Sequence, residues 1–243
     1  SGLLGESGFR EYMNQLDTPL ETGYLFRIGI DHFKEINDNF GQEYGDFVLK
    51  KTAECISGCL SEGQRVYKLV ADEFLILDAS SDETKDADKL YDKVREAIDR
   101  FIETNEFKVM YTVSGGIVPF AALKGNQCSE ALKLTDFALN EAKKLGRNRC
   151  YIFNGETYRK FLRKREITQE LREAVINGFQ GFTAFYQPVF AEDKKVPYGA
   201  EALMRFTSEK FGMISRRVHS ILEETGLIIL LPLDDERGYG KMQ

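Results

Sequence analysis

Short apolar runs and longer segments with helical spacing alternate along the first 155 residues. Runs rich in aromatic and β-branched side chains, which are typical of strands, lie at residues 23–30, 65–69, 74–77, 107–118 and 149–153. Apolar side chains three and four residues apart, which indicate helices, lie at residues 44–60, 84–101 and 129–145. Up to residue 118 the predicted order of elements is therefore βαββαβ.

This order predicts an α+β fold, the ferredoxin-like sandwich, with helices on one face of an antiparallel sheet. The runs at residues 65–69 and 74–77 are close in the chain, so we expect a β-hairpin with residues 70–73 as its turn. Gly146 follows the last predicted helix of this region, and glycine at that position is a signal for a helix C-terminus.

A second domain is expected after residue 155, so that the first domain spans residues 1–155. Residues 156–180 are rich in charged side chains, which predicts a solvated connecting helix. Apolar runs at residues 182–190 and 196–206 then belong to a second domain, residues 181–243. Pro188 argues against a central position in a sheet for the first of these runs, because proline donates no ladder hydrogen bond.

The composition indicates a globular chain that does not bind nucleic acid through a basic surface. Hydrophobic residues make up 42%, and 33 Lys and Arg stand against 39 Asp and Glu, for a net charge of -6. The longest apolar run near the end, residues 227–231, is far shorter than the ~20 residues of a membrane helix. We therefore expect no membrane contact by this chain.

Four cysteines without paired spacing and only two histidines provide too few ligands for a zinc site. Free thiols indicate a reducing compartment, and we expect a cytoplasmic location. Because the chain begins at Ser1 without an initiator methionine, we expect it to be part of a longer protein with an upstream sensor domain.

Five motifs follow one another along the first domain: I-D-H-F-K-E-I-N-D at residues 30–38, G-D at 45–46, A-D-E-F at 71–74, T-V-S-G-G-I at 112–117 and A-K-K-L-G-R-N at 142–148. With these motifs in this order, residues 1–154 resemble the GGDEF family of diguanylate cyclases. The resemblance implies a nucleotide-cyclase-like version of the ferredoxin-like fold.

The resemblance also implies a chemistry. In the family, two subunits each supply half of a site in which two GTP molecules are joined into cyclic di-GMP, with the help of divalent cations. Asn37 and Asp46 match the residues that read the guanine edge. Lys34, Lys143 and Arg147 match those that neutralise the triphosphate. GTP and a second copy of the chain are therefore the expected partners.

The carboxylates that the family uses for its cations are incomplete in this sequence. Asp72 and Glu73 match signature positions, Asp72 as a metal ligand and Glu73 as the catalytic carboxylate. Gly29 stands where the family has its first metal-binding Asp. Asp31 points to the same face of the strand but lies ~6.6 Å further along, too far for the strict geometry of Mg2+. We therefore expect Mg2+ to bind weakly if at all.

Two further family positions are altered. Val70 and Ala71 replace the signature glycines, at a turn where glycine permits positive φ and where phosphates approach the backbone, and a valine is expected to fit there badly. Ser61 and Gln64 replace the Arg and Asp of the product-inhibition site, so feedback by cyclic di-GMP is not expected.

A second resemblance begins with Y-Q-P at residues 186–188 and G-A-E-A-L-M-R-F at residues 199–206, which look like the opening of an EAL domain, the cyclic di-GMP phosphodiesterase module. It implies that Glu201 binds a metal and that Gln187 and Arg205 contact the nucleotide. EAL domains are similar to TIM-like α/β barrels, which take ~250 residues, and far fewer remain here. The resemblance therefore implies a truncated barrel whose uncovered strand edges favour self-association.

The sequence thus predicts a catalytically impaired GGDEF domain that acts as a regulatory or GTP-binding module in cyclic di-GMP signalling, joined to an incomplete EAL domain. Three alternatives stay open. One is an active diguanylate cyclase, the second is a regulator of a phosphodiesterase in a longer parent, and the third is a protein-interaction scaffold without a ligand.

Overall fold

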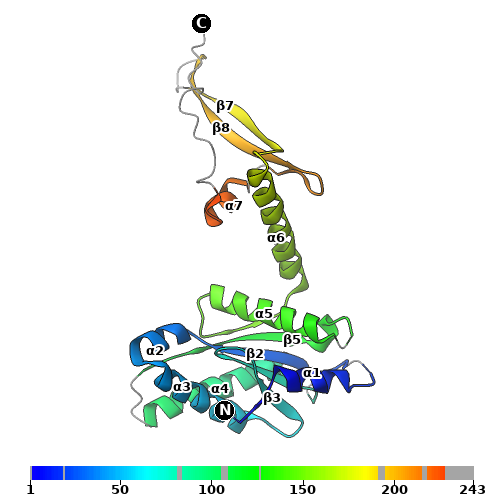
Figure 1. Cartoon of the computed structure of the whole chain (residues 1–243), viewed down its shortest axis with the longest axis vertical. Coiled ribbons are helices and arrows are strands. Elements are labelled where there is room, and N and C mark those ends of the chain that lie inside the picture. Colours follow the sequence, from blue (N-terminus) through cyan, green and yellow to red (C-terminus); the bar gives the residue numbers. More distant parts are fainter. Residues whose placement is uncertain are drawn as a thin grey trace. The chain divides into compact units, whose positions relative to one another are not determined.

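The computed structural model describes residues 2–18, 20–80, 84–104, 109–125, 127–190, 195–214 and 218–227. The chain divides into two compact units, Ser1–Gly155 and Glu156–Gln243. Each unit combines helices with its own β-sheet (Figure 1), so each is described by itself.

A six-stranded sheet forms the centre of the first unit. Its strands are β1 (Leu4–Gly5), β2 (Tyr24–Ile30), β3 (Gln64–Lys68), β4 (Glu73–Asp78), β5 (Val113–Pro119) and β6 (Cys150–Ile152). In space they follow the order β1-β3-β4-β2-β5-β6. The four central strands, β3, β4, β2 and β5, pair antiparallel with one another. The two edge strands pair parallel, β1 with β3 and β6 with β5. The sheet is mixed, so the prediction of an antiparallel sheet holds only for its centre.

Helices cover both faces of this sheet. They are α1 (Glu6–Asn14), α2 (Phe33–Phe40), α3 (Gln42–Cys59), α4 (Thr84–Thr104), the short 3-10 helix η1 (Phe120–Ala122) and α5 (Cys128–Lys144). α3 and α4 pack on one face, and α1 and α5 pack on the other (Figure 1). The prediction of helices on one face was wrong, because β2 buries side chains on both sides, Ile28 in one core and Leu25 in the other. A strand that is apolar on both faces needs cover on both.

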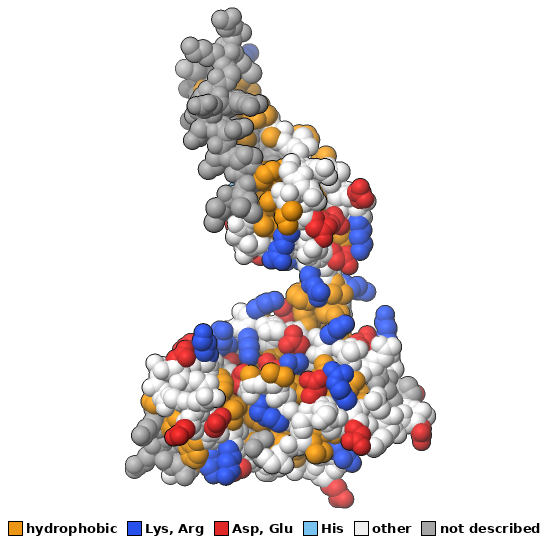
Figure 2. Space-filling view, viewed as in Figure 1, with side chains coloured by type: hydrophobic (Ala, Val, Ile, Leu, Met, Phe, Trp, Pro, Cys, Tyr) orange, Lys and Arg blue, Asp and Glu red, His pale blue; other side chains and the backbone are white. Residues whose placement is uncertain are grey.

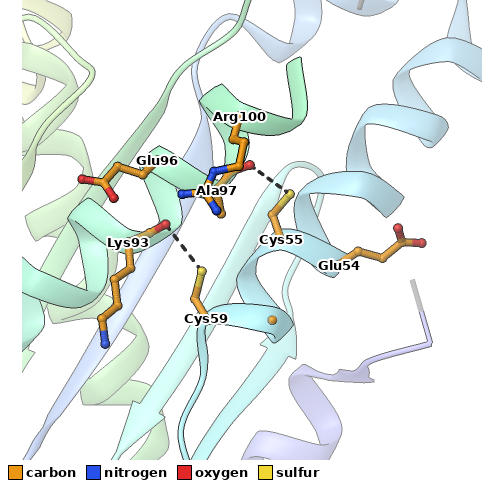
Figure 3. A pocket seen from close by; sticks show the side chains of 8 residues that line it. Glu54, Cys55, Cys59, Lys93, Glu96, Ala97 and Arg100 are labelled. Atoms are coloured by element: carbon orange, nitrogen blue, oxygen red, sulfur yellow. Dashed lines mark hydrogen bonds between the residues drawn. The ribbon is translucent and has the colours of Figure 1, made fainter. Parts of the chain in front are cut away.

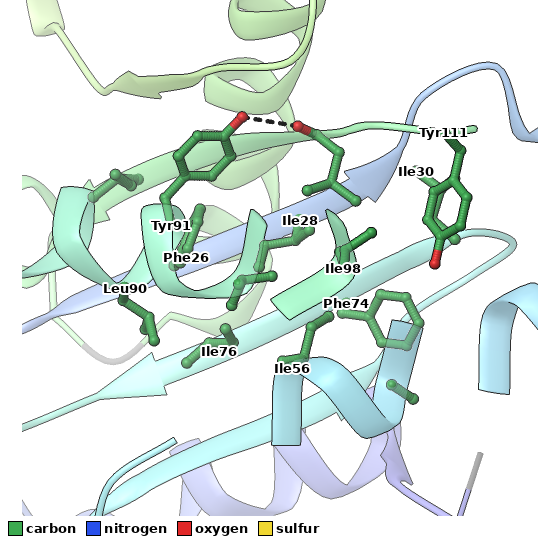
Figure 4. Close-up of a cluster of buried hydrophobic side chains, with 14 of the residues drawn as sticks. Phe26, Ile28, Ile30, Ile56, Phe74, Ile76, Leu90, Tyr91, Ile98 and Tyr111 are labelled. Carbon is green, nitrogen blue, oxygen red and sulfur yellow. Dashed lines mark hydrogen bonds between the residues drawn. The ribbon is translucent and has the colours of Figure 1, made fainter. Parts of the chain in front are cut away.

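The larger core lies between the sheet and the helices α3 and α4 (Figure 4). Alternate residues of β2 and β4 meet one face of each helix in this core: Phe26, Ile28, Phe74 and Ile76 from the strands, and Ile56, Leu90, Tyr91 and Ile98 from the helices. The Tyr91 hydroxyl donates a hydrogen bond to the carbonyl oxygen of Val113 at 3.0 Å. Burial of each such side chain stabilises the fold by about 1.5–3 kcal/mol, so this core holds the end of β2 in place.

Most predicted elements are present, with shifted ends. The segment after β2 forms its own helix, α2, which ends at Gly41, where φ is 82°. β5 begins at Val113 instead of residue 107, and residues 107 and 108 of that prediction lie outside the described residues. The predicted end of α5 is confirmed, because Gly146 has a φ of 114° and its N–H donates to the carbonyl of Lys143.

α5 lies directly against β5. A Cβ atom built on Gly116 would lie 2.2 Å from the backbone nitrogen of Leu139 and 2.6 Å from the carbonyl carbon of Ala138. No side chain fits in that space, so the second glycine of the T-V-S-G-G-I motif is required for helix packing. This close approach brings the C-terminal end of α5 over the end of β2.

The second unit contains α6 (Gly155–Ile176), β7 (Phe182–Phe190), β8 (Pro197–Ser208), β9 (Gly212–Ile214) and α7 (Val218–Glu224). Its strands form an antiparallel sheet in the order β7-β8-β9. Pro188 therefore lies on an edge strand, as predicted. α6 is not only a solvated connection, because its apolar side chains Ile167 and Leu171 are buried with Phe206 and Leu222. The TIM-like barrel remains a prediction.

Among the helices that the structure describes, none is long and apolar enough to cross a membrane. Figure 2 shows basic and acidic side chains interspersed over the visible face of the first unit.

Candidate functional site

The candidate site lies beside α5, where β2 ends and β4 begins. Gly29 of β2 stands directly opposite Glu73 of β4 and Ser114 of β5 in the sheet register. Side chains at directly opposite positions have Cβ atoms about 4.5–5.5 Å apart. A carboxylate at residue 29 would therefore adjoin Glu73, whereas Gly29 contributes no side chain.

Arg27 binds the carboxylate of Glu73. Its Nε atom donates to Glu73 Oε2 at 2.6 Å, and the two side chains are only 14% and 18% exposed. On the side of α5, Arg27 Nη1 donates to the carbonyl of Leu132 at 3.2 Å, and Nη2 lies 3.4 Å from Asp136 Oδ1. Arg27 thus ties β4 to α5 and neutralises the predicted catalytic carboxylate.

Arg27 was absent from the residues singled out by sequence. A signal for it existed, because Arg27 is the single charged residue in the strand Tyr24–Ile30. It also stands two residues from Gly29, and side chains two apart in a strand share one face. Because Arg27 shares a face with Gly29, where the family resemblance leads one to expect a carboxylate, its guanidinium is a candidate partner for the carboxylate of Glu73.

Lys143 of α5 lies over Gly29. A Cβ atom built on Gly29 would be 3.1 Å from Lys143 Nζ and 3.2 Å from Leu139 Cδ2. The lysine ammonium therefore stands beside the space into which a side chain at residue 29 would project. The structure places Lys143, which was predicted from sequence, at the same site as Gly29 and Glu73.

Asp31 is the residue weighed from sequence as a substitute metal ligand, and in the structure its carboxylate makes hydrogen bonds within the protein. Its side chain is buried and accepts hydrogen bonds from Thr112 Oγ1 and Ser114 Oγ, both at 2.7 Å, and from the backbone N–H of Asn148 at 3.1 Å. Three donors occupy its two oxygens, so Asp31 fastens the turn after α5 to β5. This turn carries Arg147, whose φ is 60°.

The turn between β3 and β4 is braced by Lys68. Its ammonium donates to the carbonyl oxygens of Leu69 at 2.9 Å, Glu73 at 3.3 Å, and Ala71. Burial lowers the pKa of Lys68. Ala71 has a φ of 54°, which costs roughly 1–2 kcal/mol for a residue other than glycine, and the lysine contacts offset part of that cost.

The expectation that a valine fits badly in this turn was wrong. Val70 does not adopt a positive φ, in contrast to Ala71. Its side chain is 74% exposed and extends into solvent. Asp72, the predicted metal ligand that follows, is half-buried at the end of the turn.

The predicted guanine-reading residues lie together where α2 meets α3. A Cβ atom built on Gly45 would be 1.8 Å from Asn37 Oδ1, so the Asn37 side chain occupies the space beside Gly45. Asp46, the next residue of α3, is exposed. The glycine of the G-D motif therefore allows the amide of Asn37 to lie against the helix that carries Asp46.

Three predicted phosphate-binding cations are not neutralised by the protein. Lys34 and Arg147 are exposed and Lys143 is half-buried. Within the described part of the chain, none of the three forms an ion pair with a carboxylate, whereas the neighbouring Lys144 pairs with Glu141. Unpaired cations near one strand end favour an anionic ligand.

The altered product-inhibition positions form a closed network. Gln64 Oε1 accepts a hydrogen bond from the N–H of Ser61 at 2.8 Å, and Gln64 Nε2 donates to Asp78 Oδ2 at 2.6 Å. Asp78 Oδ1 accepts a further hydrogen bond from the Ser80 hydroxyl at 2.7 Å. Gln64 thus uses both ends of its amide within the protein.

In the second unit, β7 and β8 place Gln187 beside Glu201, whereas Arg205 lies four residues further along β8. Gln187 pairs with Glu201, and Thr183 pairs with Arg205, in the antiparallel register. Arg205 lies 6.0 Å from the centre of the Phe185 ring, and Glu201 is exposed. Among the residues that can be described, no group of three or more His, Cys, Asp or Glu side chains is arranged to hold a metal ion.

A separate hollow of roughly 460 Å³ lies between α3 and α4 (Figure 3). Cys55 and Cys59 line it and donate to the carbonyl oxygens of Ala97 and Lys93, at 3.8 and 3.5 Å. Burial raises the pKa of both thiols. None of the predicted nucleotide-binding residues lines this hollow, so the hollow is distinct from the site at the end of β2.

Comparison with known proteins agrees with this arrangement. Residues 6–149 match the family described as diguanylate cyclase, GGDEF domain. The chain is 28% identical over 202 residues to the cyclic di-GMP phosphodiesterase NbdA of Pseudomonas aeruginosa, covering 83% of this chain and 25% of NbdA. It is 30% identical over 209 residues to the signaling protein YkoW of Bacillus subtilis, covering 84% and 26%. The chain thus spans about a quarter of the length of these curated relatives.

A solved structure shares the fold. The GGDEF domain of TpbB, also called YfiN, from Pseudomonas aeruginosa superposes with a TM-score of 0.58 at 25% identity, covering 66% of this chain and 95% of that domain. The four central strands of the sheet, the hairpin turn and the residues around Gly29 fall within the matched family region, residues 6–149. This chain belongs to the GGDEF family of diguanylate cyclase domains.

Proposed function

We propose that the GGDEF domain of this chain binds GTP as a regulatory module of cyclic di-GMP signalling and does not convert GTP to cyclic di-GMP. The observation that carries this proposal is the ion pair between Arg27 and Glu73 beside Gly29. One carboxylate expected to serve the divalent cations is absent, and another is neutralised by a guanidinium.

The parts of the site that serve binding are retained. Asn37 lies against Gly45, next to the exposed carboxylate of Asp46. A carboxylate accepts hydrogen bonds from the ring N–H and amino group of guanine. Lys34, Lys143 and Arg147 supply positive charge for the phosphates. Binding without turnover therefore agrees with the residues present.

Incubation with GTP and either Mg2+ or Mn2+, followed by chromatography, tests for turnover. We expect no cyclic di-GMP above the level of a protein-free sample. Formation of cyclic di-GMP would establish the alternative, an active cyclase that uses Asp72 and Glu73 with relocated cations.

Calorimetric titration with GTP tests for binding. Asp46→Asn should weaken GTP binding by at least tenfold, because a neutral amide replaces the acceptor for guanine. Asp38→Asn, an exposed position on α2, provides the matched control and should bind as the unaltered chain does. Absence of any binding heat for the unaltered chain would favour a protein-interaction scaffold instead.

The second unit favours a further role, regulation of a phosphodiesterase in a longer parent. Gln187 and Glu201 are cross-strand neighbours, as expected if β7 and β8 begin an EAL domain. NbdA, a relative of this chain, is a cyclic di-GMP phosphodiesterase. In the parent protein, hydrolysis of cyclic di-GMP should change when GTP is added, and an Asp46→Asn variant should lose that response.

Self-association is a further part of the proposal. β7 is a nine-residue edge strand without a charged side chain, and such an edge pairs readily with another strand. Sedimentation of the purified chain over a range of concentrations should show a dimer, whereas a strict monomer would contradict it.

A further inference from the structure

Beside Gly29, the carboxylate of Glu73 has a cationic partner within the protein. The guanidinium of Arg27 carries a permanent positive charge and lies among Glu73 Oε2, Asp136 Oδ1 and the carbonyl of Leu132. Glu73 therefore has its counter-charge within the protein. A divalent cation that approaches this carboxylate therefore meets the permanent positive charge of the guanidinium on Oε2.

A second cation is built in at the adjacent position. Lys143 Nζ would lie 3.1 Å from a Cβ atom at Gly29. An ammonium thus stands beside the space that a side chain at residue 29 would enter, and it repels any second cation there. Positive groups therefore stand beside both members of the opposite pair, with Arg27 at Glu73 and Lys143 at Gly29.

The residues present do not fit Mg2+. Mg2+ requires near-octahedral oxygen ligands at about 2.0–2.1 Å, usually including one or two carboxylates. At this site Glu73 is engaged by Arg27, and Asp31 already accepts three hydrogen bonds. Asp72 is left as a single carboxylate at the turn.

From this disagreement we infer that the site takes GTP in its metal-free form, with Lys143 acting directly on the phosphates. The inference rests on the proposed GTP binding and adds the ionic form of the ligand. Free GTP carries more negative charge than its magnesium complex. It therefore matches Lys34, Lys143 and Arg147 better, since these cations form no ion pair with any described residue. Magnesium then competes with the protein for the triphosphate.

Calorimetry with GTP in EDTA and in excess Mg2+, at matched ionic strength, tests this inference on the full chain. We expect binding in EDTA to be several-fold tighter than in Mg2+. Binding that is equal in the two buffers, or tighter in Mg2+, would overturn the inference while leaving GTP binding in place. Absence of binding in both buffers would overturn the proposed function itself.

Lys143→Met should weaken binding in EDTA by about tenfold or more, because a phosphate contact is lost. Lys144→Met is the matched control, since Lys144 is the next residue, is exposed and already pairs with Glu141. If the two variants lose affinity equally, Lys143 has no special position and the inference is wrong.

Gly29→Asp should reverse the preference for the metal-free ligand. Gly29 does not have a left-handed φ, and its nearest neighbours are the flexible ends of Lys143 and Leu139, so an Asp fits. The new carboxylate would pair with Lys143, weaken binding in EDTA and make Mg2+ favourable. Circular dichroism confirms folding, and a folded Gly29→Asp variant that still prefers EDTA contradicts the assignment.

Discussion

Arg27 of β2 and Glu73 of β4 form a partly buried ion pair that joins residues 46 positions apart, with 2.6 Å between Nε and Oε2. They meet because the strand register sets Arg27 opposite Leu75, and Glu73 opposite Gly29, two residues further along. Residues two apart share one face of a strand, so the guanidinium reaches diagonally to the carboxylate.

The first prediction concerns this pair. Arg27→Leu should lower the free energy of unfolding by about 2 kcal/mol, because it leaves Glu73 without its charged partner in a poorly exposed position. Urea denaturation measures the change. Arg10→Leu is a matched control, since its pair with Glu6 is solvent-exposed and should contribute much less to stability than the Arg27 pair. If the two variants lose the same free energy of unfolding, the Arg27–Glu73 pair contributes no more to stability than an exposed ion pair.

The second prediction concerns two glycines of α3. Gly45→Ala should destabilise the domain by about 1–3 kcal/mol and displace Asn37, because the new Cβ would meet Asn37 Oδ1 at 1.8 Å. Gly58→Ala, on the same helix with no atom within 4 Å of its Cβ, should instead stabilise by about 0.5–1 kcal/mol. Thermal unfolding of both variants shows whether each substitution raises or lowers stability. Stabilisation by Gly45→Ala would contradict the close contact with Asn37.

The third prediction concerns acid stability. Burial acts to raise the pKa of Asp78, but hydrogen bonds from Ser80 and Gln64 outweigh it and hold the pKa below its usual value. A carboxyl with a lowered pKa in the folded state stabilises the fold above its unfolded pKa of about 3.9, and this contribution is lost as the pH falls through the folded pKa.

Asp78→Asn should therefore flatten the decline in stability between about pH 5 and pH 3. Urea denaturation at several pH values measures this decline in both proteins. A variant whose stability falls as steeply as that of the unaltered chain would show that Asp78 does not contribute to acid sensitivity.

The fourth prediction concerns Cys150. Burial and a hydrogen bond to Asp88 raise the pKa of this thiol to about 12, and the Sγ–Oδ1 distance is 3.0 Å. At pH 8 the thiolate fraction is then on the order of one in ten thousand. Cys150 should resist iodoacetamide in the folded protein and react in urea, as read by mass spectrometry of the peptide. Asp88→Asn should increase the reactivity of the folded protein, and no change would argue against that contact.

Much of the fold and of the candidate site follows from local patterns. The period of apolar residues located β2, the β3–β4 hairpin and α5, because burial on a strand or helix face repeats at a fixed spacing. The motifs around Asn37, Asp46 and Lys143 predicted the side chains that we propose bind the nucleotide. The absence of a carboxylate at residue 29 can also be read directly from the sequence, where that position is Gly29.

Only the tertiary structure decided how the remaining charges are used. The sequence indicated that Asp31 lies too far along the strand to be a substitute ligand, and the structure shows that it fastens the turn at Asn148 to β5. The ion pair of Arg27 with Glu73 and the position of Lys143 over Gly29 depend on strand register and on the approach of α5 to Gly116. Charges interact over a few ångströms of space whatever their separation in the chain, so their partners become known only when the strands and helices are in place.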